Sequence, residues 1–549
     1  MTKRIFALLL ALVLVVGLLP MGTLAAETSS AWDGTTVAEP KKVDGVYQIG
    51  TAEELAWFGQ QSQKYGDANR TLNAKLTADI DLNNQNWTDY VIGKNSSSYY
   101  GGTFDGDGHT VKGYRIYKNV TKNSTIYLGL FGATSKAAIR NLTLEGSVEI
   151  DMNGATARAY SGYVAGLVAE AKGTTIQNVV VDVDISLTNN DSKYGAITTG
   201  GVAARVSFVS ENGATTDDPK VITDSLIENC ENRGNVVGGG SAGGIAARTA
   251  NCVTVRNCKN SGDITSVTTY AGGIVGDIAG TTVEGCANTG SISGGYNAGG
   301  IVGNVYASHS TNAENPGTWM AVIRNCYNTG DVVCQGYSTS YDYYAAGIVG
   351  KSSGYIGQSY QDKSTNIIEN CYTTGKATLG QESAKLHAAG LVGAVTHTEI
   401  ANCYYLEGAA EVGSTDSTAA KNITMKTEAE MKAKDFAAAL GDAYKVRSKD
   451  YPALTWEKVS GSVNVAVTAN AEHALIRILD AEQNEVAPNE DGTYTLETGK
   501  TYTYTARAAG YVTAAGTIDD VASAADEGFV ITMAKSADYP RDLDAQWPS

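Results

Sequence analysis

Short apolar patches recur along the middle of the chain. Each patch begins with glycine, continues with two apolar residues and ends with glycine or alanine. A unit of this size cannot bury a core alone, so the repeat indicates stacked units that share one core. The patches begin at Gly129, Gly166, Gly201, Gly244, Gly273, Gly300, Gly347 and Gly390.

Between the patches, short β-branched runs alternate with corners that contain glycine. Residues 174–181 read Thr-Thr-Ile-Gln-Asn-Val-Val-Val, and Asn-Thr-Gly corners stand at 288–290 and 328–330. Such runs are typical of strands, and we expect the glycine to supply a positive φ at each corner. Residues 126–422 are therefore predicted to form a parallel β-solenoid in an all-β chain, with the longer repeats adding loops on one side.

The segments that flank the repeats begin with helix signals. In segment 27–125, Thr51 and Glu54 have capping-box spacing before an apolar run, which predicts a short helix followed by short strands. Segment 423–457 repeats this signal with Thr427 and Glu430, and Gly441 is expected to end its helix. We expect 27–125 to form the N-terminal cap and the first coils, and 423–457 to cover the other end.

The last part of the chain follows a different pattern. Residues 463–467 and 502–506 alternate with period two, which predicts a small antiparallel β-sandwich over 460–535. Residues 536–549 are expected to be a linker or the start of a further domain.

The first residues resemble an export signal. Lys3 and Arg4 precede an apolar run, and small residues follow at 23–26, so 1–26 is predicted to be a cleaved signal peptide. We therefore expect a secreted or cell-surface protein with no transmembrane segment in the mature chain. The formal net charge of −17 becomes more negative when the two cations are removed, which argues against nucleic acid as a partner.

The string Ala-Gly-Gly-Ile-Val-Gly occurs at 271–276 and again at 298–303, and Asn-Cys-Tyr-Asn-Thr-Gly follows at 325–330. The combination resembles the GLUG motif repeat of bacterial secreted and surface proteins. This resemblance implies a right-handed parallel β-helix on an exported, often adhesin-like protein. The strings at 491–496 and 509–511 resemble carboxypeptidase-regulatory-like or PEGA-like sandwiches, which are Ig-like modules.

Six of the eight cysteines occupy the same position of the repeat. Equivalent residues of neighbouring coils stack about 4.8 Å apart, whereas the Cβ atoms of a disulfide lie near about 3.8 Å. We therefore expect an inward ladder of free thiols, with Cys252 and Cys334 outside it and their pairing open. The ladder residues are Cys230, Cys258, Cys286, Cys326, Cys371 and Cys403.

An asparagine precedes the cysteine in five of these units. Amide side chains at equivalent positions can satisfy one another's donors and acceptors along a solenoid, so we expect a second ladder of structural residues. Its members are Asn229, Asn257, Asn325, Asn370 and Asn402.

Parallel β-helices include polysaccharide lyases and hydrolases, so the acidic clusters of this chain are candidate catalytic groups. Carboxylates near one another are the groups such chemistry needs, and they occur as Asp79 with Asp81 and as Asp105 with Asp107 and His109. Aspartate beside glycine or asparagine is also a turn former, and we favour that interpretation. No metal-binding spacing of cysteine or histidine occurs, so we expect no metal and no cofactor. No equivalent acidic cluster recurs at fixed positions in the central repeats, so we also expect no catalysis.

Tyrosines offer the best candidate binding residues. The chain has 31 tyrosines and 7 phenylalanines. Tyr327, Tyr372 and Tyr404 follow ladder cysteines, and alternation would turn them outward as a stripe. A second group, Tyr341, Tyr343 and Tyr344, lies in one insert. Such rings suit contact with glycans or host and cell-surface proteins, and stacking that only stabilises the solenoid face is the alternative.

Three functions remain open from the sequence. The first is a non-catalytic exported surface or extracellular protein that serves as an adhesin-like binding or display scaffold. The second is a carbohydrate-active β-helix enzyme, and the third is a passive spacer for a missing C-terminal domain.

Overall fold

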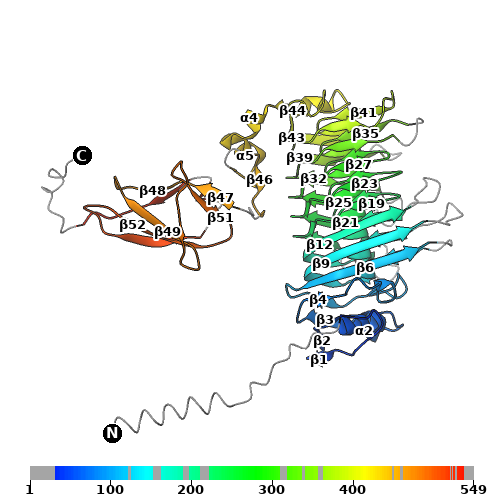
Figure 1. Ribbon diagram of the computed structural model, residues 1–549. Coiled ribbons are helices and arrows are strands. Elements are labelled where there is room, and N and C mark those ends of the chain that lie inside the picture. The colour runs from blue at the N-terminus through cyan, green and yellow to red at the C-terminus, as the bar shows by residue number, and fades with distance from the viewer. Residues whose placement is uncertain are drawn as a thin grey trace, which may run out of the picture.

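In the computed structural model, a tall stack of strands is followed by a smaller C-terminal module (Figure 1). The all-β class is confirmed, and most strands pair in parallel. The expected signal peptide lies outside the described residues, as do residues 537–549. The structure describes residues 31–120, 125–152, 162–188, 197–210, 222–309, 318–336, 341–356, 363–447, 450–457, 462–519, 521, 524–525 and 528–536.

Each repeat passes once around the stack and pairs with the equivalent part of the next repeat. Cys371 lies opposite Cys403, for example, and Tyr372 lies opposite Tyr404. Within the described residues, the strands that lead into the patches form one parallel sheet. Its members are β7 (Ile126–Leu128), β10 (Gly162–Ala165), β13 (Ile197–Gly200), β20 (Ala242–Gly243), β24 (Ala271–Gly272), β28 (Ala298–Gly299), β35 (Tyr343–Ala346) and β41 (Leu386–Ala389).

A second row of parallel strands follows the patches, and a third row follows after a further bend. The second row contains β8 (Phe131–Ser135), β11 (Val168–Lys172), β14 (Ala203–Ser207), β21 (Ala246–Arg256), β25 (Val275–Glu284), β29 (Val302–Tyr306), β36 (Val349–Ser353) and β42 (Val392–Thr396). The third row contains β9 (Ala138–Asp151), β12 (Thr175–Thr188), β17 (Ser225–Glu228), β32 (Val322–Arg324), β39 (Asn366–Thr373) and β43 (Thr398–Leu406), and β21 and β25 extend into it.

Short strands complete each pass. They are β18 (Glu231–Asn232), β22 (Lys259–Asn260), β26 (Ala287–Asn288) and β33 (Tyr327–Asn328), followed by β19 (Val236–Gly238), β23 (Ile264–Ser266), β27 (Ile292–Gly294), β34 (Val332–Cys334) and β40 (Ala377–Leu379). The longer repeats insert hairpins after the second row, as expected for loops on one side. These hairpins are β15 (Val209–Ser210) with β16 (Ile222–Thr223), β30 (Ser308–His309) with β31 (Thr318–Trp319), and β37 (Tyr355–Ile356) with β38 (Lys363–Ser364).

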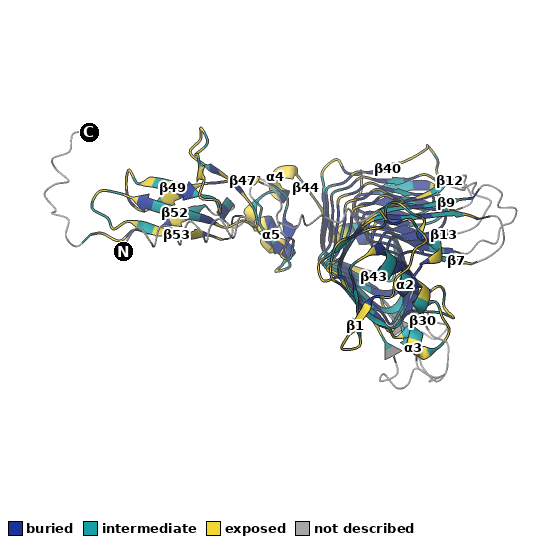
Figure 2. Cartoon of the chain, turned by 60° about the horizontal axis from the view of Figure 1, so that its bottom comes forward, coloured by how far each residue is buried: buried dark blue, intermediate teal, exposed yellow. Residues whose placement is uncertain are grey.

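Along each strand of the stack, apolar side chains at alternating positions face the interior. In β12, Ile176, Val179 and Val181 are fully buried, while the residues between them are more exposed. In Figure 2 much of the length of the stacked strands is coloured as buried. Burial of β-branched side chains at this spacing is the main stabilising contribution to the stack.

A ladder of buried amides runs through this interior, and we call it the amide ladder. The Nδ2 atom of Asn260 donates to Oδ1 of Asn288 at 2.7 Å, and Asn288 donates to Asn328 at the same distance. Asn232 begins the ladder and is also fully buried, as are the other three. Each amide donates a second bond to the carbonyl two residues on, so it fixes its own corner as well as its neighbour.

The patch glycines pack against this ladder. A Cβ atom on Gly273 would lie 2.3 Å from the Asn288 side chain, and one on Gly244 would lie 2.3 Å from that of Asn260. These distances leave no room for any side chain. The repeated glycine of the patch therefore corresponds to a repeated amide on the opposite side of the core.

The prediction that glycine supplies a positive φ at the corners is wrong. Gly290 does not have a positive φ; it is required because a Cβ atom there would lie 2.0 Å from the Gly262 carbonyl oxygen of the previous coil. The left-handed conformation instead belongs to the residue before each ladder cysteine, which is an asparagine in five repeats and Gly285 in the sixth. The expected outer asparagines have φ values of 54° (Asn229), 54° (Asn257), 55° (Asn325), 53° (Asn370) and 51° (Asn402). Asparagine tolerates this region better than other side-chain-bearing residues.

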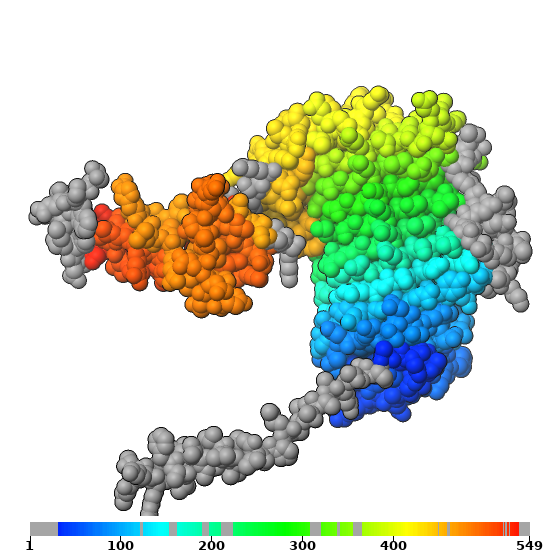
Figure 3. All heavy atoms as spheres, in the orientation of Figure 1, coloured from blue at the N-terminus to red at the C-terminus, as the bar shows by residue number. Residues whose placement is uncertain are grey.

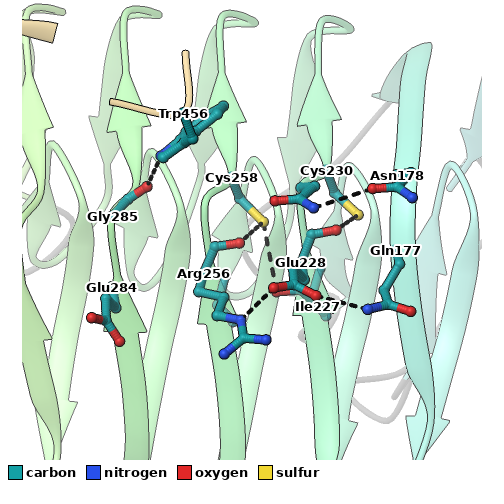
Figure 4. Close-up of polar contacts among 12 residues, drawn as sticks. Gln177, Asn178, Ile227, Glu228, Cys230, Arg256, Cys258, Glu284, Gly285 and Trp456 are labelled. Carbon is teal, nitrogen blue, oxygen red and sulfur yellow. Dashed lines mark hydrogen bonds and ion pairs between the residues drawn. The ribbon is translucent and has the colours of Figure 1, made fainter. Parts of the chain in front are cut away.

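Three of the five predicted asparagines form the expected row of side-chain hydrogen bonds, whereas Asn229 bonds to Asn178, which was not predicted to belong to the row. Asn402 donates to Asn370 at 2.9 Å, and Asn370 donates to Asn325 at 3.1 Å. Asn229 donates to Asn178 at 3.2 Å (Figure 4). The row is interrupted at Gly285, which takes the asparagine position with a φ of 60° and carries no amide.

The six repeat cysteines lie in the interior as free thiols. All six are buried, and Cys230 and Cys258 donate to the carbonyl oxygens of Glu228 and Arg256, two residues earlier in the chain, at 3.3 and 3.2 Å (Figure 4). Burial raises the pKa of the Cys258 thiol. Cys252 and Cys334 are also free. The thiols therefore act as small apolar core residues, as expected.

The N-terminal segment covers the first end of the stack. Its helix α2 (Ala52–Ser62) begins at Thr51, whose side chain accepts from the Glu54 amide as the capping pattern predicts. Leu55 and Phe58 are fully buried. The other elements are β1 (Lys41–Val43), β2 (Val46–Ile49), α3 (Asp67–Arg70), β3 (Asn73–Leu76), β4 (Ile80–Asp81), η1 (Trp87–Asp89), β5 (Thr103–Asp105) and β6 (Thr110–Asn119).

Only the first strand of the C-terminal segment, β44 (Ile423–Lys426), lies on the end of the stack, where it pairs with β43 next to η3 (Ala419–Asn422). The rest of the segment lies along the side of the stack (Figure 3). The expected helix is two helices, α4 (Glu428–Met431) and α5 (Lys434–Leu440), followed by β45 (Tyr444–Lys445) and β46 (Ala453–Leu454). The segment runs back along the stack until the Trp456 ring nitrogen donates to the Gly285 carbonyl at 2.8 Å (Figure 4).

The C-terminal module has its own core. Within the described residues it contains a four-stranded antiparallel sheet, one antiparallel pair and one parallel pair. The parallel pairing of β48 with β54 differs from the fully antiparallel sandwich that was expected. Its strands are β47 (Ser462–Val465), β48 (Val467–Ala469), β49 (Leu475–Leu479), β50 (Glu485–Val486), β51 (Tyr494–Glu497), β52 (Tyr502–Arg507), β53 (Ala514–Ile518) and β54 (Phe529–Ile531).

We predict that Asn288→Ala lowers the free energy of unfolding by about 2–4 kcal/mol, because it leaves buried amide groups without partners and opens a small cavity. Chemical denaturation of both proteins measures this loss. The matched control is Ser293→Ala in the same coil, whose hydroxyl accepts only an exposed hydrogen bond from Gln335. The control is expected to change stability by no more than about 0.5 kcal/mol, and equal effects of the two substitutions would contradict the role of the amide ladder.

Candidate functional site

The tyrosines predicted to form an open stripe are covered. Alternation does turn Tyr327 and Tyr372 outward from the strands, and their rings stack 5.2 Å apart. However, their exposed fractions are only 5% and 0%, and Tyr404 is half-buried. The reason is the C-terminal segment, whose Phe436 and Tyr444 pack on this apolar face.

Polar contacts fix the segment on the tyrosines. The Tyr327 hydroxyl donates to both carboxylate oxygens of Glu457 at 2.9 and 3.0 Å, and the Tyr372 hydroxyl donates to the Pro452 carbonyl. Burial raises the pKa of both hydroxyls, so they remain donors. Glu457 also lies 3.6 Å from the Lys259 ammonium. Tyr327 and Tyr372 thus bind a segment of the same chain.

The second group of tyrosines is divided by the structure. The Tyr343 side chain points into the core with 4% exposed, so it is not available for binding. Tyr341 is 70% exposed, and Tyr344 is half-buried against the ring of His387 at 5.2 Å. Only Tyr341 and Tyr344 of this group are accessible.

The candidate catalytic carboxylates are each engaged by a neighbouring group. Asp79 accepts from the Thr110 amide at 2.9 Å and contacts His109 at 3.2 Å, and these bonds lower its pKa. Asp105 accepts from Arg140 and Asn141, while Asp107 pairs with Lys75 at 2.9 Å. Asp81 accepts from the Asn83 amide within its own turn. These contacts are those of turn and ion-pair residues.

A different surface brings aromatic and polar side chains together, along the corner between the first and second rows of strands. At each patch the chain bends so sharply that a Cβ atom on Gly243 would lie 2.0 Å from the Ala246 carbonyl oxygen. Side chains just before and just after the bend therefore face one another outside the stack. We call this surface the corner strip.

Two rows of equivalent residues form the corner strip. The first row precedes the bend and contains Tyr127, Tyr163, Thr198, Ser241, Tyr270, Asn297, Tyr344 and His387. The second row follows the bend and contains Glu170, Arg205, Arg248, Asp277, Asn304 and Lys351.

Contacts join the two rows across the bend. The Arg205 guanidinium donates to the Tyr163 hydroxyl at 2.9 Å and lies over that ring. Further along the stack, Asn297 donates to Asn304 at 3.3 Å. The hydroxyls of Tyr270 and Tyr306 lie 3.1 Å apart, which adds a second-row strand end to the strip. The rows therefore form one continuous surface.

The acidic groups of the corner strip are buried, and hydrogen bonds and ion pairs balance their charge. Asp277 accepts from Asn304 at 3.1 Å and pairs with Arg248 at 3.2 Å. Burial nevertheless raises its pKa, against the opposing effect of Arg248. Glu170 accepts from Ser96 at 2.7 Å and lies 3.1 Å from Lys172. Hydrogen-bonded acids of this kind position their cationic neighbours toward solvent.

The arrangement is suited to an extended ligand with a short repeat. Adjacent coils present equivalent groups about 4.8 Å apart. The polar residues Thr198, Ser241, Asn297 and Asn304 are buried, so the groups that a ligand can reach are the half-buried tyrosine rings and the cations Arg205, Arg248 and Lys351. Tyrosine rings provide apolar contact with a polar edge, and the cationic groups provide hydrogen-bond donors. A glycan chain needs both kinds of contact.

The sequence contains a signal for the corner strip that we did not recognise. The second-row residue always lies four positions after the patch glycine, as Arg205 follows Gly201 and Asp277 follows Gly273. The first-row residue lies three positions before that glycine in seven repeats, and Tyr127 lies two positions before Gly129. The residue types at the first-row and second-row positions differ between repeats, so identical residues do not mark these positions in the sequence.

Comparison with known proteins finds no family model and no curated protein that match this chain. Among the described residues, no helix is long and apolar enough to cross a bilayer.

We predict that Asp277→Asn stabilises the folded protein, relative to wild type, increasingly as pH rises. Between the ordinary carboxyl pKa of 3.8 and its raised folded value, the folded protein binds the proton more tightly than the unfolded chain. The stability that Asp277 contributes is therefore lost as pH rises through this window, whereas asparagine has no charge to bury. Relative to wild type, the variant should gain unfolding free energy as pH rises from the ordinary carboxyl pKa of 3.8 through the raised pKa of Asp277.

Denaturation of both proteins across this range provides the measurement. Glu382→Gln, at an exposed position, is the control and should give a difference that does not change with pH. A constant difference for Asp277→Asn would contradict a buried, raised carboxyl at this position.

Proposed function

We propose that the stack is a right-handed parallel β-helix and that the chain is an exported, non-catalytic scaffold that binds glycans along the corner strip. The parallel pairing of each repeat with the next supports the β-helix. The resemblance to GLUG repeats and the signal-like residues 1–26 support export to the cell surface or medium. The C-terminal module, which resembles carboxypeptidase-regulatory-like sandwiches, then serves as an accessory display module.

One observation is central to the binding proposal: aromatic, amide and charged side chains from successive coils are in contact along a single corner of the stack. Tyr163 with Arg205, and Asn297 with Asn304, are joined by hydrogen bonds across the bend. A scaffold that only stabilised itself would need apolar or self-complementary rows. This surface instead presents exposed cations and half-buried tyrosine rings on several coils, which supports recognition of a polymer.

Binding is favoured over catalysis by the state of the carboxylates. A glycosidase needs one protonated and one ionised carboxyl near the same bond. Here Asp277 pairs with Arg248, and Glu170 is held by Ser96 and Lys172, so neither faces an open space together with a second acid. The enzyme and the passive spacer are the two functions that a binding experiment must exclude.

We predict that Tyr306→Ala weakens glycan binding on the order of fivefold, because a ring contact contributes about 1 kcal/mol. Tyr306 is 41% exposed, so its loss should leave the melting temperature nearly unchanged. Tyr306→Phe, which keeps the ring, should retain most of the affinity. The measurement is binding of the full chain to a glycan array, followed by titration with the best ligand.

Tyr511→Ala, in the C-terminal module, is the matched control and should not change affinity. Binding to no glycan would refute the proposal in favour of a spacer or a protein-binding adhesin. Release of new reducing ends or unsaturated products from any polysaccharide would refute it in favour of an enzyme.

A further inference from the structure

The accessible charge of the corner strip is positive, although the whole chain is acidic with a net charge of −17. The side chains of Lys172, Arg205 and Arg248 are 37%, 44% and 57% exposed. Their acidic partners Glu170 and Asp277 are only 3% and 6% exposed. On these coils solvent, and any ligand, therefore meets the cations and not the acids. Toward the other end of the strip, Asp342 is 45% exposed and pairs with His387 at 3.3 Å.

Lys351 adds a cation further along the same row. Its side chain is partly exposed, and no acidic partner for it occurs among the described residues. Arg205 and Arg248 lie on adjacent coils, at the spacing of about 4.8 Å between paired strands. A single small anion would need one such group, whereas a row of them matches a chain of regularly spaced anions.

A cavity of about 490 Å³ lies at the N-terminal end of the corner strip. Tyr127, the first residue of the strip, lines it, and Ser96 joins it to the strip by contacts with the Tyr127 hydroxyl at 3.1 Å and with Glu170 at 2.7 Å. Two lysines, Lys94 and Lys118, also line the cavity.

The charge of this cavity is also positive. In the described part of the chain, neither Lys94 nor Lys118 has an ion pair, and Asp89 is the one acid among the residues that line the cavity. Ser96, Ser97 and Asn95 add hydroxyl and amide groups that can bind sugar oxygens. The volume is within the range of pockets for small organic molecules, and it suits one terminal sugar.

We infer that the glycan is a linear polyanion that carries carboxylate or sulfate groups. Its charged terminal residue binds in the cavity between Lys94 and Lys118, and the following residues lie along Arg205, Arg248 and Lys351. This inference rests on the proposed function and adds the substrate class to it. Because the exposed Arg205 and Arg248 each pair with a buried acid, they offer positive charge to a ligand while the acids reduce the repulsion between the two cations.

The test compares ligands that differ only in charge. The full chain is titrated with an oligogalacturonate and with its methyl ester, which has the same backbone without the carboxylates. We expect the methyl ester to bind at least tenfold more weakly, and raised salt to weaken only the acid. A sulfated dextran oligosaccharide and unsulfated dextran repeat the comparison for sulfate.

The variants compare two arginines on the same strand. Arg248→Gln in the corner strip should weaken binding of the oligogalacturonate three- to tenfold. Arg256→Gln, which lies on β21 but pairs with Glu228 on another face, should leave it unchanged. Lys351→Gln, with no ion pair to disturb, and Lys94→Gln with Lys118→Gln should each weaken binding at least threefold without lowering the melting temperature.

The outcomes separate this inference from the proposed function. Stronger binding of either charged glycan than of its uncharged form, with selective loss in the strip variants, would support the inference and identify carboxylate or sulfate as the anion. Equal binding of charged and uncharged forms, still weakened by Tyr306→Ala, would overturn the inference and leave the glycan-binding function. Equal loss of affinity in Arg248→Gln and Arg256→Gln would overturn the inference, because it would indicate non-specific electrostatic attraction of the glycan to the protein. No binding to any of the glycans would refute both the inference and the proposed function.

Discussion

The contact between a buried amide and a glycine is the constraint on which the stack depends. Asn288 bonds to the coils on both sides, and Gly273 approaches it so closely that no side chain fits. The buried amide needs its hydrogen-bond partners, and the glycine position has no room for a side chain. These two requirements therefore determine the residue type at both positions in every middle coil. The sharp bend at the patch follows from the same packing, and the bend creates the corner strip outside. Core and surface are thus determined together.

The sequence predicted the elements that depend on local patterns. The parallel strands, the helix after Thr51, the helix signal at Thr427 and the inward cysteines follow from periodicity and capping, which act over a few residues. It misassigned the Asn-Thr-Gly corners, because a turn residue and a buried ladder residue look alike in one repeat. Only the stacking of Asn288 on Asn328 distinguishes them.

The candidate site was less predictable, because it depends on contacts between distant segments. Alternation correctly turned Tyr327 outward, but it could not indicate that residues 130 positions later would cover it through Glu457. The corner strip depends on the register of eight coils, which brings Tyr163 against Arg205. A distance of 42 residues along the chain carries no local signal for such a contact.

The direction of the amide ladder has a consequence for how such a protein can change in length. Every Nδ2 donor points to the next coil, from Asn232 to Asn328, and the last donates to Thr373 at 3.2 Å. A coil duplicated within this run would receive one hydrogen bond and give one, so its insertion would create no unpaired amide. Each duplication would also lengthen the corner strip by one position. Recombination between near-identical repeats can therefore adjust the reach of the surface in steps of one coil while the core stays satisfied.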